Sequence, residues 1–528
     1  MLRRSITFSF AFSMLLISLP VLVAKIPPIL DYPNHVVRMW LLSGGVTIAP
    51  VSTMYKIVWA NASTNIGIDI VASALGGVIS STIISGFVLF FALALPPLGA
   101  ACLHRQVFGG AHWWQIGIVL LAWNEVTLRG LLNFEVALGL ALMGAVADAS
   151  MVAIGAITAC AGRMLLGAAI LLVHPFGLFF YAILIGALAL GPQFAPLTHL
   201  NELGRRIGQA VLDCLPIVAS LIGFLVLAPH LPGEQVGAAA WDVVWQSHWV
   251  LGHLLMMLIP VRTYDLKLDL GFLALLLLPI VISTILGRIR FHAGLLLAAV
   301  ALFVLSNFMP TRVAGTAAIE VRVPCMAALT LAAALRPDIS ASILWNRIAL
   351  AAMLMLATAR TLWITDIWVA RQADVAAVER ALSYVPSGSA LLSMENKPDK
   401  QQLSRAPLGR FIEQGQPVFW HLPVLAIMER HAFVPTLFTA LGKQPVAVLP
   451  PWNQIAVAEG ILPPVDLLNG SANDGRFPYL DHWRDRFDYL LVVNADMANA
   501  KGPLPSLYEL HLMADEGFAR LYRISNAK

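Results

Sequence analysis

Long apolar runs recur along the first two thirds of the chain and constrain its fold more than any other feature. A helix needs about 20 apolar residues to cross a bilayer. The 528 residues are 59% hydrophobic and 12% charged, with a mean hydropathy of +0.77, which is typical of a polytopic membrane protein. About eleven candidate spans meet the length criterion. They are residues 6–24, 82–103, 112–123, 131–147, 151–173, 176–190, 207–227, 270–286, 291–308, 321–335 and 343–364.

Arginines at the ends of these runs predict one orientation. Arg3 and Arg4 precede the first run, which is too long for a secretory signal, so we expect an uncleaved span and a cytoplasmic N-terminus. The other basic residues that fall on that same side are His104, Arg105, Arg205, Arg206, Arg288, Arg290, Arg336 and Arg347. Arg163 is an exception inside a span. Pro175 marks either a kink in one helix or a turn between two.

Polar residues return after Trp368, where the composition changes. We therefore expect a polytopic α-helical membrane domain over residues 1–366 and a small α/β periplasmic domain over residues 367–528. Its predicted strands are 390–394, 489–493 and 518–524, and its predicted helices are 374–384 and 507–516. The predicted outer loops are residues 25–81, 124–130 and 229–268. The tryptophans of the third loop suit a membrane interface.

Several functional classes lack their sequence signals. The 34 Lys and Arg residues are scattered against 30 Asp and Glu residues, so the sequence does not suggest nucleic-acid binding. The four cysteines lie singly in apolar runs and form no C-x-x-C pair. A Walker loop, a dinucleotide fingerprint and a metal-ligand pattern are also missing. We read Asp69, Glu135, Asp148 and Asp213 as loop or helix-end residues.

The first candidate site lies just past the first apolar run. Asp31, His35 and Arg38 fall within eight residues, at the mouth of a span. If the segment after Pro33 is helical, His35 and Arg38 share a face, and Asp31 lies at the helix entry. The alternative is structural, with Asp31 as a helix cap and Arg38 as a juxtamembrane residue.

Two further charged pairs and one histidine are candidates. Glu125 and Arg129 are spaced i, i+4 in the second outer loop, where a simple ion pair is equally compatible. Glu320 and Arg322 lie at the outer end of a late span. His174 precedes a proline, and we favour a structural role for it as a helix-breaking, hydrogen-bonded histidine.

These groups suit a phosphate at the membrane surface. The predicted topology puts them on the outer side. Arginine binds phosphate through bidentate, charge-assisted bonds, and a nearby carboxylate can take a proton from an attacking hydroxyl. A lipid-linked phosphate, with its head group at the interface, fits both properties.

The chain resembles the GT-C superfamily of integral membrane glycosyltransferases, of the protein mannosyltransferase and aminoarabinose transferase type, and more closely a bacterial branch of multi-spanning proteins. The shared features are the first span, an acidic residue early in a long first outer loop, many short spans and a C-terminal periplasmic domain. The strings that carry the resemblance are PPILDYPNHVVR (27–38), GLLNF (130–134), HPFG (174–177), EVR (320–322), HLP (421–423) and AFVPTLF (432–438).

The resemblance implies an inverting transfer of a sugar from a polyprenyl-phosphate carrier to a glycan, lipid or protein acceptor, at the outer face of a bacterial inner membrane. Asp31 would be the general base, and Glu125 would match a second acidic residue. Arg38, Arg129 and Arg322 would bind the donor phosphate, with His35, Glu320 and His174 in support. Asp31 is not followed by Glu, and the W-W-D motif of oligosaccharyltransferases is absent, which leaves the acceptor and any divalent metal open.

Two other functional classes use the same residues differently. A transporter or flippase for lipid-linked sugars would need the arginines but no base. A non-catalytic scaffold for polysaccharide assembly would use the region after Trp368 as its binding module.

Overall fold

The computed structural model describes residues 2–193, 200–227, 243–245, 251–313, 316–412, 415–457, 460–469, 477–498 and 509–525. The chain divides into two compact units. The first, which we call the helical unit, contains Met1–Val21 and Val88–Ile364; the second, the mixed unit, contains Leu22–Phe87 and Thr365–Lys528. Each unit is described by itself below.

Seven apolar helices in the described residues are long enough to cross a membrane. They are α1 (Leu2–Leu16) continued by α2 (Ser18–Val23), α5 (Ser81–Phe108), α8 (Leu132–Ile154), α9 (Ala156–Val173), α11 (Leu200–Leu227), α13 (Leu266–Ile285) and α16 (Ile343–Leu382). Three shorter apolar helices are α10 (Pro175–Leu190), α14 (Ala293–Ser306) and α15 (Arg322–Ala334). The apolar run at 112–123 folds as the six-residue α6 (Trp114–Val119) and a 3-10 turn (Leu120–Ala122). The predicted membrane-protein class agrees with these helices.

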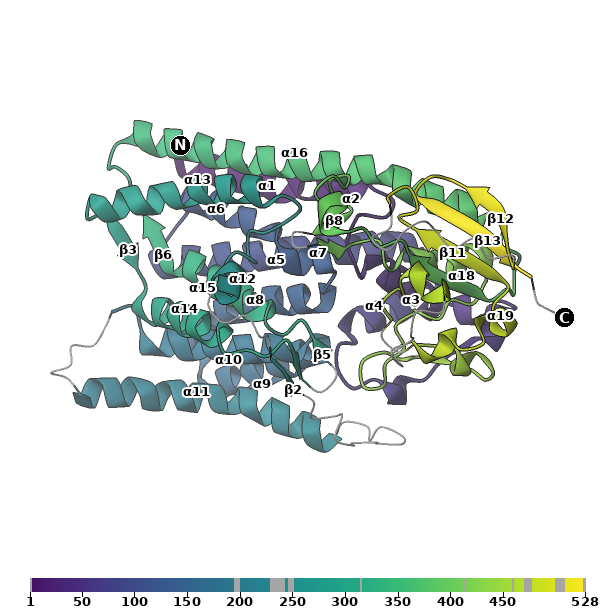
Figure 1. Cartoon of the computed structure of the whole chain (residues 1–528). Helices are drawn as coiled ribbons and strands as arrows, with labels where there is room; N and C mark the ends of the chain where they lie inside the picture. Colours follow the sequence, from purple (N-terminus) through teal and green to yellow (C-terminus); the bar gives the residue numbers. More distant parts are fainter. Residues whose placement is uncertain are drawn as a thin grey trace. The chain divides into compact units, whose positions relative to one another are not determined.

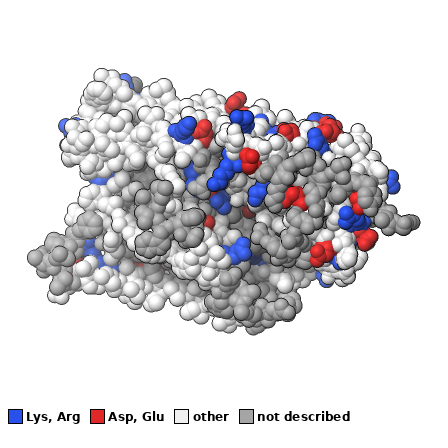
Figure 2. All heavy atoms as spheres, in the orientation of Figure 1, with Lys and Arg blue, Asp and Glu red and all other residues white. Residues whose placement is uncertain are grey.

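The core of the helical unit is a bundle in which α8, α9, α10, α11, α14 and α15 pack on one another (Figure 1). Small residues allow close approach: a Cβ on Gly139 of α8 would collide with Leu95 of α5. At the left of Figure 2, where Figure 1 shows α13 and α14, few charged atoms are visible, as expected of a lipid-facing surface.

The structure of this bundle answers two questions that the sequence left open: the role of Pro175 and the environment of Arg163. His174 alone separates α9 from α10, so Pro175 begins a new helix rather than kinking one. Arg163 is not solvated: its Nε lies 2.7 Å from Asp148 Oδ1 and its Nη1 2.5 Å from Asp213 Oδ1. The interpretation of these two aspartates as loop or helix-end residues was wrong, because both lie within helices and neutralise a buried arginine.

The mixed unit contains a four-stranded sheet in the order β12-β13-β11-β7. Strands β7 (Leu391–Glu395) and β11 (Tyr489–Val493) are parallel, whereas β13 (Ala519–Ile524) is antiparallel to β11 and to β12 (Leu510–Asp515). These bounds confirm the three predicted strands. The helix predicted at 507–516 was wrong over the described part of that range. Residues 510–515 form β12, which pairs with β13 through a turn at Gly517 (φ +71°), and cross-strand pairing overrides the local helical composition.

The change in composition at Trp368 does not mark the start of a separate helix, because α16 continues without a break to Leu382. The first predicted outer loop is itself folded, with α3 (Tyr32–Leu42) and α4 (Gly67–Leu75) packed together. Its strand β1 (Tyr55–Ile57) pairs antiparallel with β10 (Val446–Val448), and α18 (Leu425–Arg430) packs on α3. The first loop and the C-terminal region therefore form one structure.

Candidate functional site

Asp31 lies in the mixed unit, where its side chain pairs with a histidine and does not cap a helix. It occupies the N-cap position of α3, but its side chain accepts no capping hydrogen bond. Its Oδ1 instead lies 3.4 Å from Nε2 of His421, and 19% of the Asp31 side chain is exposed. The Asp31 side chain therefore does not cap α3, and a partly exposed carboxylate is paired with a buried imidazole.

The ring of His421 also has an aromatic neighbour. Phe438 packs edge-on against it with ring centroids 4.8 Å apart. The backbone N–H of Phe438 donates to Asn34 Oδ1 at 2.9 Å, which ties this segment back to α3. Because His421 is only 3% exposed, Asp31 is the member of the pair that a solute can reach.

Arg38 has a different environment from Asp31. Its Nε donates to Asp69 Oδ1 at 2.7 Å, and its Nη2 lies 3.1 Å from His35 Nδ1. The side chains of Arg38 and Asp69 are 1% and 0% exposed. Burial raises the pKa of Asp69, and the charge of Arg38 opposes that rise. This pair fastens α3 to α4. Asp69 lies in the first turn of α4, in agreement with its predicted place at a helix end, and it is also the ion-pair partner of Arg38.

A second cluster of charged residues lies in the helical unit around Glu125. This residue begins the short helix α7 (Glu125–Arg129), whose N-cap Asn124 accepts from Thr127 N–H. Glu125 Oε1 accepts from Arg129 Nη2 at 2.7 Å, and Arg262 donates to its other oxygen. The predicted i, i+4 ion pair is therefore present, with a second arginine added.

Arg322, at the start of α15, is clamped by two aromatic rings. Its guanidinium lies 5.3 Å from the ring centre of Phe176 and 5.8 Å from that of Phe134. Its Nη1 donates to the carbonyls of Ala317 and Ala318 at 3.0 Å. The clamp brings together three strings that are far apart in the sequence: GLLNF, HPFG and EVR.

Glu320 joins the two arginine groups. The charges of Arg129, Arg322 and Glu125 all act on its carboxyl group. Burial raises its pKa, and among the described residues no side chain or backbone group hydrogen-bonds its buried Oε2. Arg129 and Arg262 thus both contact Glu125, while Arg129 and Arg322 both act on Glu320, so these five residues bring together three guanidinium groups and two carboxyl groups.

His174 and Arg262 complete this picture. His174 is buried, its Nδ1 accepts from Phe176 N–H, and it packs edge-on against Phe134, in agreement with the structural role that we favoured. Arg262 and His421 received no role from the sequence. Arg262 lies four residues before the start of α13, near the end of a span, which is the kind of position that selected Arg322. Only the fold pairs His421 with Asp31.

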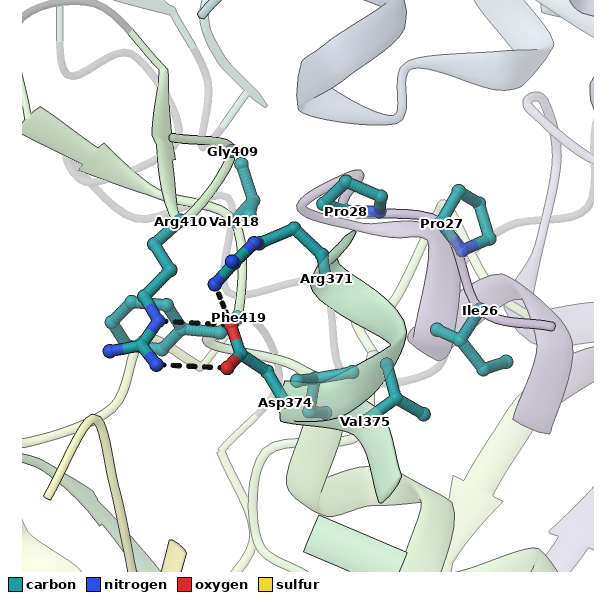
Figure 3. Close-up of a pocket in the computed structure, with 11 residues that line it drawn as sticks. Ile26, Pro27, Pro28, Arg371, Asp374, Val375, Gly409, Arg410, Val418 and Phe419 are labelled. Atoms are coloured by element: carbon teal, nitrogen blue, oxygen red, sulfur yellow. Dashed lines mark hydrogen bonds and ion pairs between the residues drawn. The ribbon is translucent and has the colours of Figure 1, made fainter. Parts of the chain in front are cut away.

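A small cavity in the mixed unit lies between the start of the first loop and α16 (Figure 3). Its volume of about 20 Å³ has room for about one water molecule. Arg371 and Arg410 both donate to Asp374 at its polar end, and Pro27 and Pro28 line its apolar side. The cavity is too small for a sugar.

Within the described ranges, no group of three or more His, Cys, Asp or Glu side chains is arranged to hold a metal ion. Compared with protein-family models, curated proteins and solved structures, the chain matches none of them.

Proposed function

We propose that this protein is an inverting membrane glycosyltransferase that transfers a sugar from a polyprenyl-phosphate donor to an acceptor on the outer face of a bacterial inner membrane. In this proposal the N-terminus is cytoplasmic and the mixed unit is periplasmic. About eleven apolar segments, short ones included, enter the bilayer.

One observation carries the proposal: the arginine cluster of the helical unit. Residues 125–129, 262 and 320–322 are distant in sequence, yet the charges of three arginines among them meet at one place, around Glu125 and Glu320. Arg129 is 23% exposed, so the cluster has an accessible cationic pole. Such a pole suits a phosphate, because guanidinium groups bind phosphate oxygens bidentately.

We assign the roles within each unit, from exposure for Asp31 and Arg129 and from charge for Arg322. Asp31 takes the proton of the acceptor hydroxyl, whose oxygen attacks the anomeric carbon. The bond from that carbon to the phosphate oxygen breaks, and the polyprenyl phosphate leaves with the electron pair. Arg129 and Arg322 stabilise the charge that develops on the phosphate. The displacement inverts the anomeric centre and needs no added oxidant or reductant.

The environments of the other candidates give them supporting roles. Glu125 is 1% exposed and lies between two arginines, so we assign it the orientation of Arg129 and Arg262. Arg38 and His35 hold the first loop through Asp69. Glu320 sets the charge of the cluster, and His174 orients Phe134 and Phe176 around Arg322.

The test is transfer in proteoliposomes that contain the full chain and a lipid extract of a bacterial envelope, with sugar-carrying polyprenyl phosphates followed by mass spectrometry. Asp31→Asn should slow the loss of lipid-linked sugar by about 10²- to 10⁴-fold. Asp515→Asn, at an exposed aspartate of the mixed unit, is the matched control and should leave the rate unchanged.

Equal rates for wild type and Asp31→Asn would overturn the role of Asp31 as base. Movement of the carrier lipid across the bilayer without sugar transfer would favour the transporter class instead.

A further inference from the structure

A two-stranded ribbon in the helical unit pairs two arginines. Strand β3 (Ile289–Phe291) joins α13 to α14, and strand β6 (Leu335–Pro337) joins α15 to α16 (Figure 1). In their antiparallel register Arg290 lies directly opposite Arg336. Like charges in directly opposed positions destabilise a ribbon, so this pairing needs a compensating anion.

Asp338 supplies part of that compensation. Its Oδ2 lies 2.8 Å from Arg290 Nη2, and its Oδ1 lies 3.4 Å from Arg336 Nε and 3.2 Å from His112 Nε2. One carboxylate therefore serves two guanidinium groups and an imidazole. The Arg290 side chain remains 55% exposed, which leaves it open to another anion.

The surroundings add only positive charge. Arg288 is exposed and donates to the Ile339 carbonyl, and Arg336 donates to the carbonyl of Phe108 at the end of α5, one turn from Arg105. The sequence contains no Asp or Glu from residue 270 to 319, and only Asp338 from 321 to 365. The ribbon is thus a fixed site of excess positive charge.

Exposed apolar side chains flank the ribbon on both sides. Ile285 and Leu286, at the end of α13, are 79% and 50% exposed, and Leu344 and Trp345, at the start of α16, are 63% and 53% exposed. A ligand that contacts both the arginines and these apolar side chains must carry an anionic group next to a hydrocarbon chain. A free phosphate ion would satisfy the arginines and leave these apolar side chains uncovered.

We propose that the β3–β6 ribbon binds the phosphate of an anionic phospholipid. The phosphate oxygens accept hydrogen bonds from Arg290 and Arg336, and the acyl chains lie along the apolar ends of α13 and α16. Trp345 then lies at the bilayer interface, where tryptophan is enriched. This site is independent of sugar transfer and of the arginine cluster around Glu125.

The test titrates the purified full chain in detergent with phosphatidylglycerol and counts bound lipid by native mass spectrometry. Phosphatidylcholine and inorganic phosphate are titrated in parallel. Arg290→Gln and Arg336→Gln should each weaken phosphatidylglycerol binding about fivefold, and the double variant more than tenfold. Arg290→Lys keeps the charge and should retain most of the binding.

Arg312→Gln is the matched control, because it removes one arginine of the same unit beyond the other end of α14, roughly 20 Å of helix away from the ribbon. Unchanged binding in Arg290→Gln and Arg336→Gln, or an equal loss in Arg312→Gln, would overturn the proposal. Phosphatidylcholine binding as tight as phosphatidylglycerol would do the same, as would full competition by millimolar inorganic phosphate.

Discussion

The buried pair of Arg38 and Asp69 gives the sharpest test of how the first loop is held. Both side chains are essentially inaccessible, and their Nε–Oδ1 distance is 2.7 Å. Replacing one partner leaves the other as an uncompensated buried charge, which costs about 3–5 kcal/mol. We therefore expect Arg38→Met and Asp69→Leu each to destabilise the mixed unit by that amount.

The double variant Arg38→Met/Asp69→Leu removes both charges and fills the space with apolar atoms, so it should recover most of the lost stability. The mixed unit contains about 230 residues. For a unit of that size 1 kcal/mol corresponds to about 2–4 °C in Tm, so each single variant should lower its Tm by roughly 6–20 °C. Thermal unfolding of the full chain, followed by tryptophan fluorescence, measures this shift.

A surface pair in the same unit is the control. Arg520 and Asp515 are 31% and 42% exposed, and Asp515→Leu should cost less than about 1 kcal/mol. Our reasoning fails if Asp69→Leu behaves like Asp515→Leu, or if the double variant is no more stable than the single ones.

Three further predictions concern other parts of the fold. Burial raises the pKa of Glu395 to about 7, although Trp420 donates to its carboxylate at 2.7 Å. Folding therefore takes up a proton, so the unfolding free energy should fall by about 3 kcal/mol as the pH rises from the ordinary Glu range to 7, and urea titrations of Glu395→Gln should show a flatter pH profile. Gly139→Ala should cost about 1–3 kcal/mol by overpacking α8 against α5, whereas Gly223→Ala, which meets no neighbouring atom, should not; detergent melting curves compare the two. Arg322→Gln should weaken polyprenyl-phosphate binding at least tenfold in a fluorescence titration, with Arg347→Gln, at an exposed arginine near the start of α16, unchanged as control.

The membrane class and most helices were predictable because apolar runs of span length have few alternative folds. The strand at 510–515 was not predictable in this way. It forms by pairing with β13, and the local composition of a segment does not indicate its strand partner. The length of α16 was missed for a related reason. The sequence of α16 becomes more polar near Trp368, but the helix continues to Leu382. We interpreted this change in polarity as the end of the helix.

The candidate site residues were likewise predictable in part: the charged residues themselves were, and most of their partners were not. Charge at the end of an apolar run selected Asp31, Glu125, Arg129, Glu320 and Arg322, because such positions are costly without a partner. Their partners came from segments more than a hundred residues distant: His421 for Asp31 and Arg262 for Glu125. A single sequence does not encode such pairings in any local pattern. Asp69, predicted as a loop or helix-end residue, does lie at a helix end, but its pairing with Arg38 across 31 residues was not predicted.

The central claim is that the arginine cluster of the helical unit holds the donor phosphate. A cryo-electron microscopy structure of the full chain with polyprenyl phosphate tests it most directly. We predict phosphate density within hydrogen-bond distance of the Arg129 or Arg322 guanidinium groups. Phosphate density elsewhere, with both arginines left as they are here, would contradict the account.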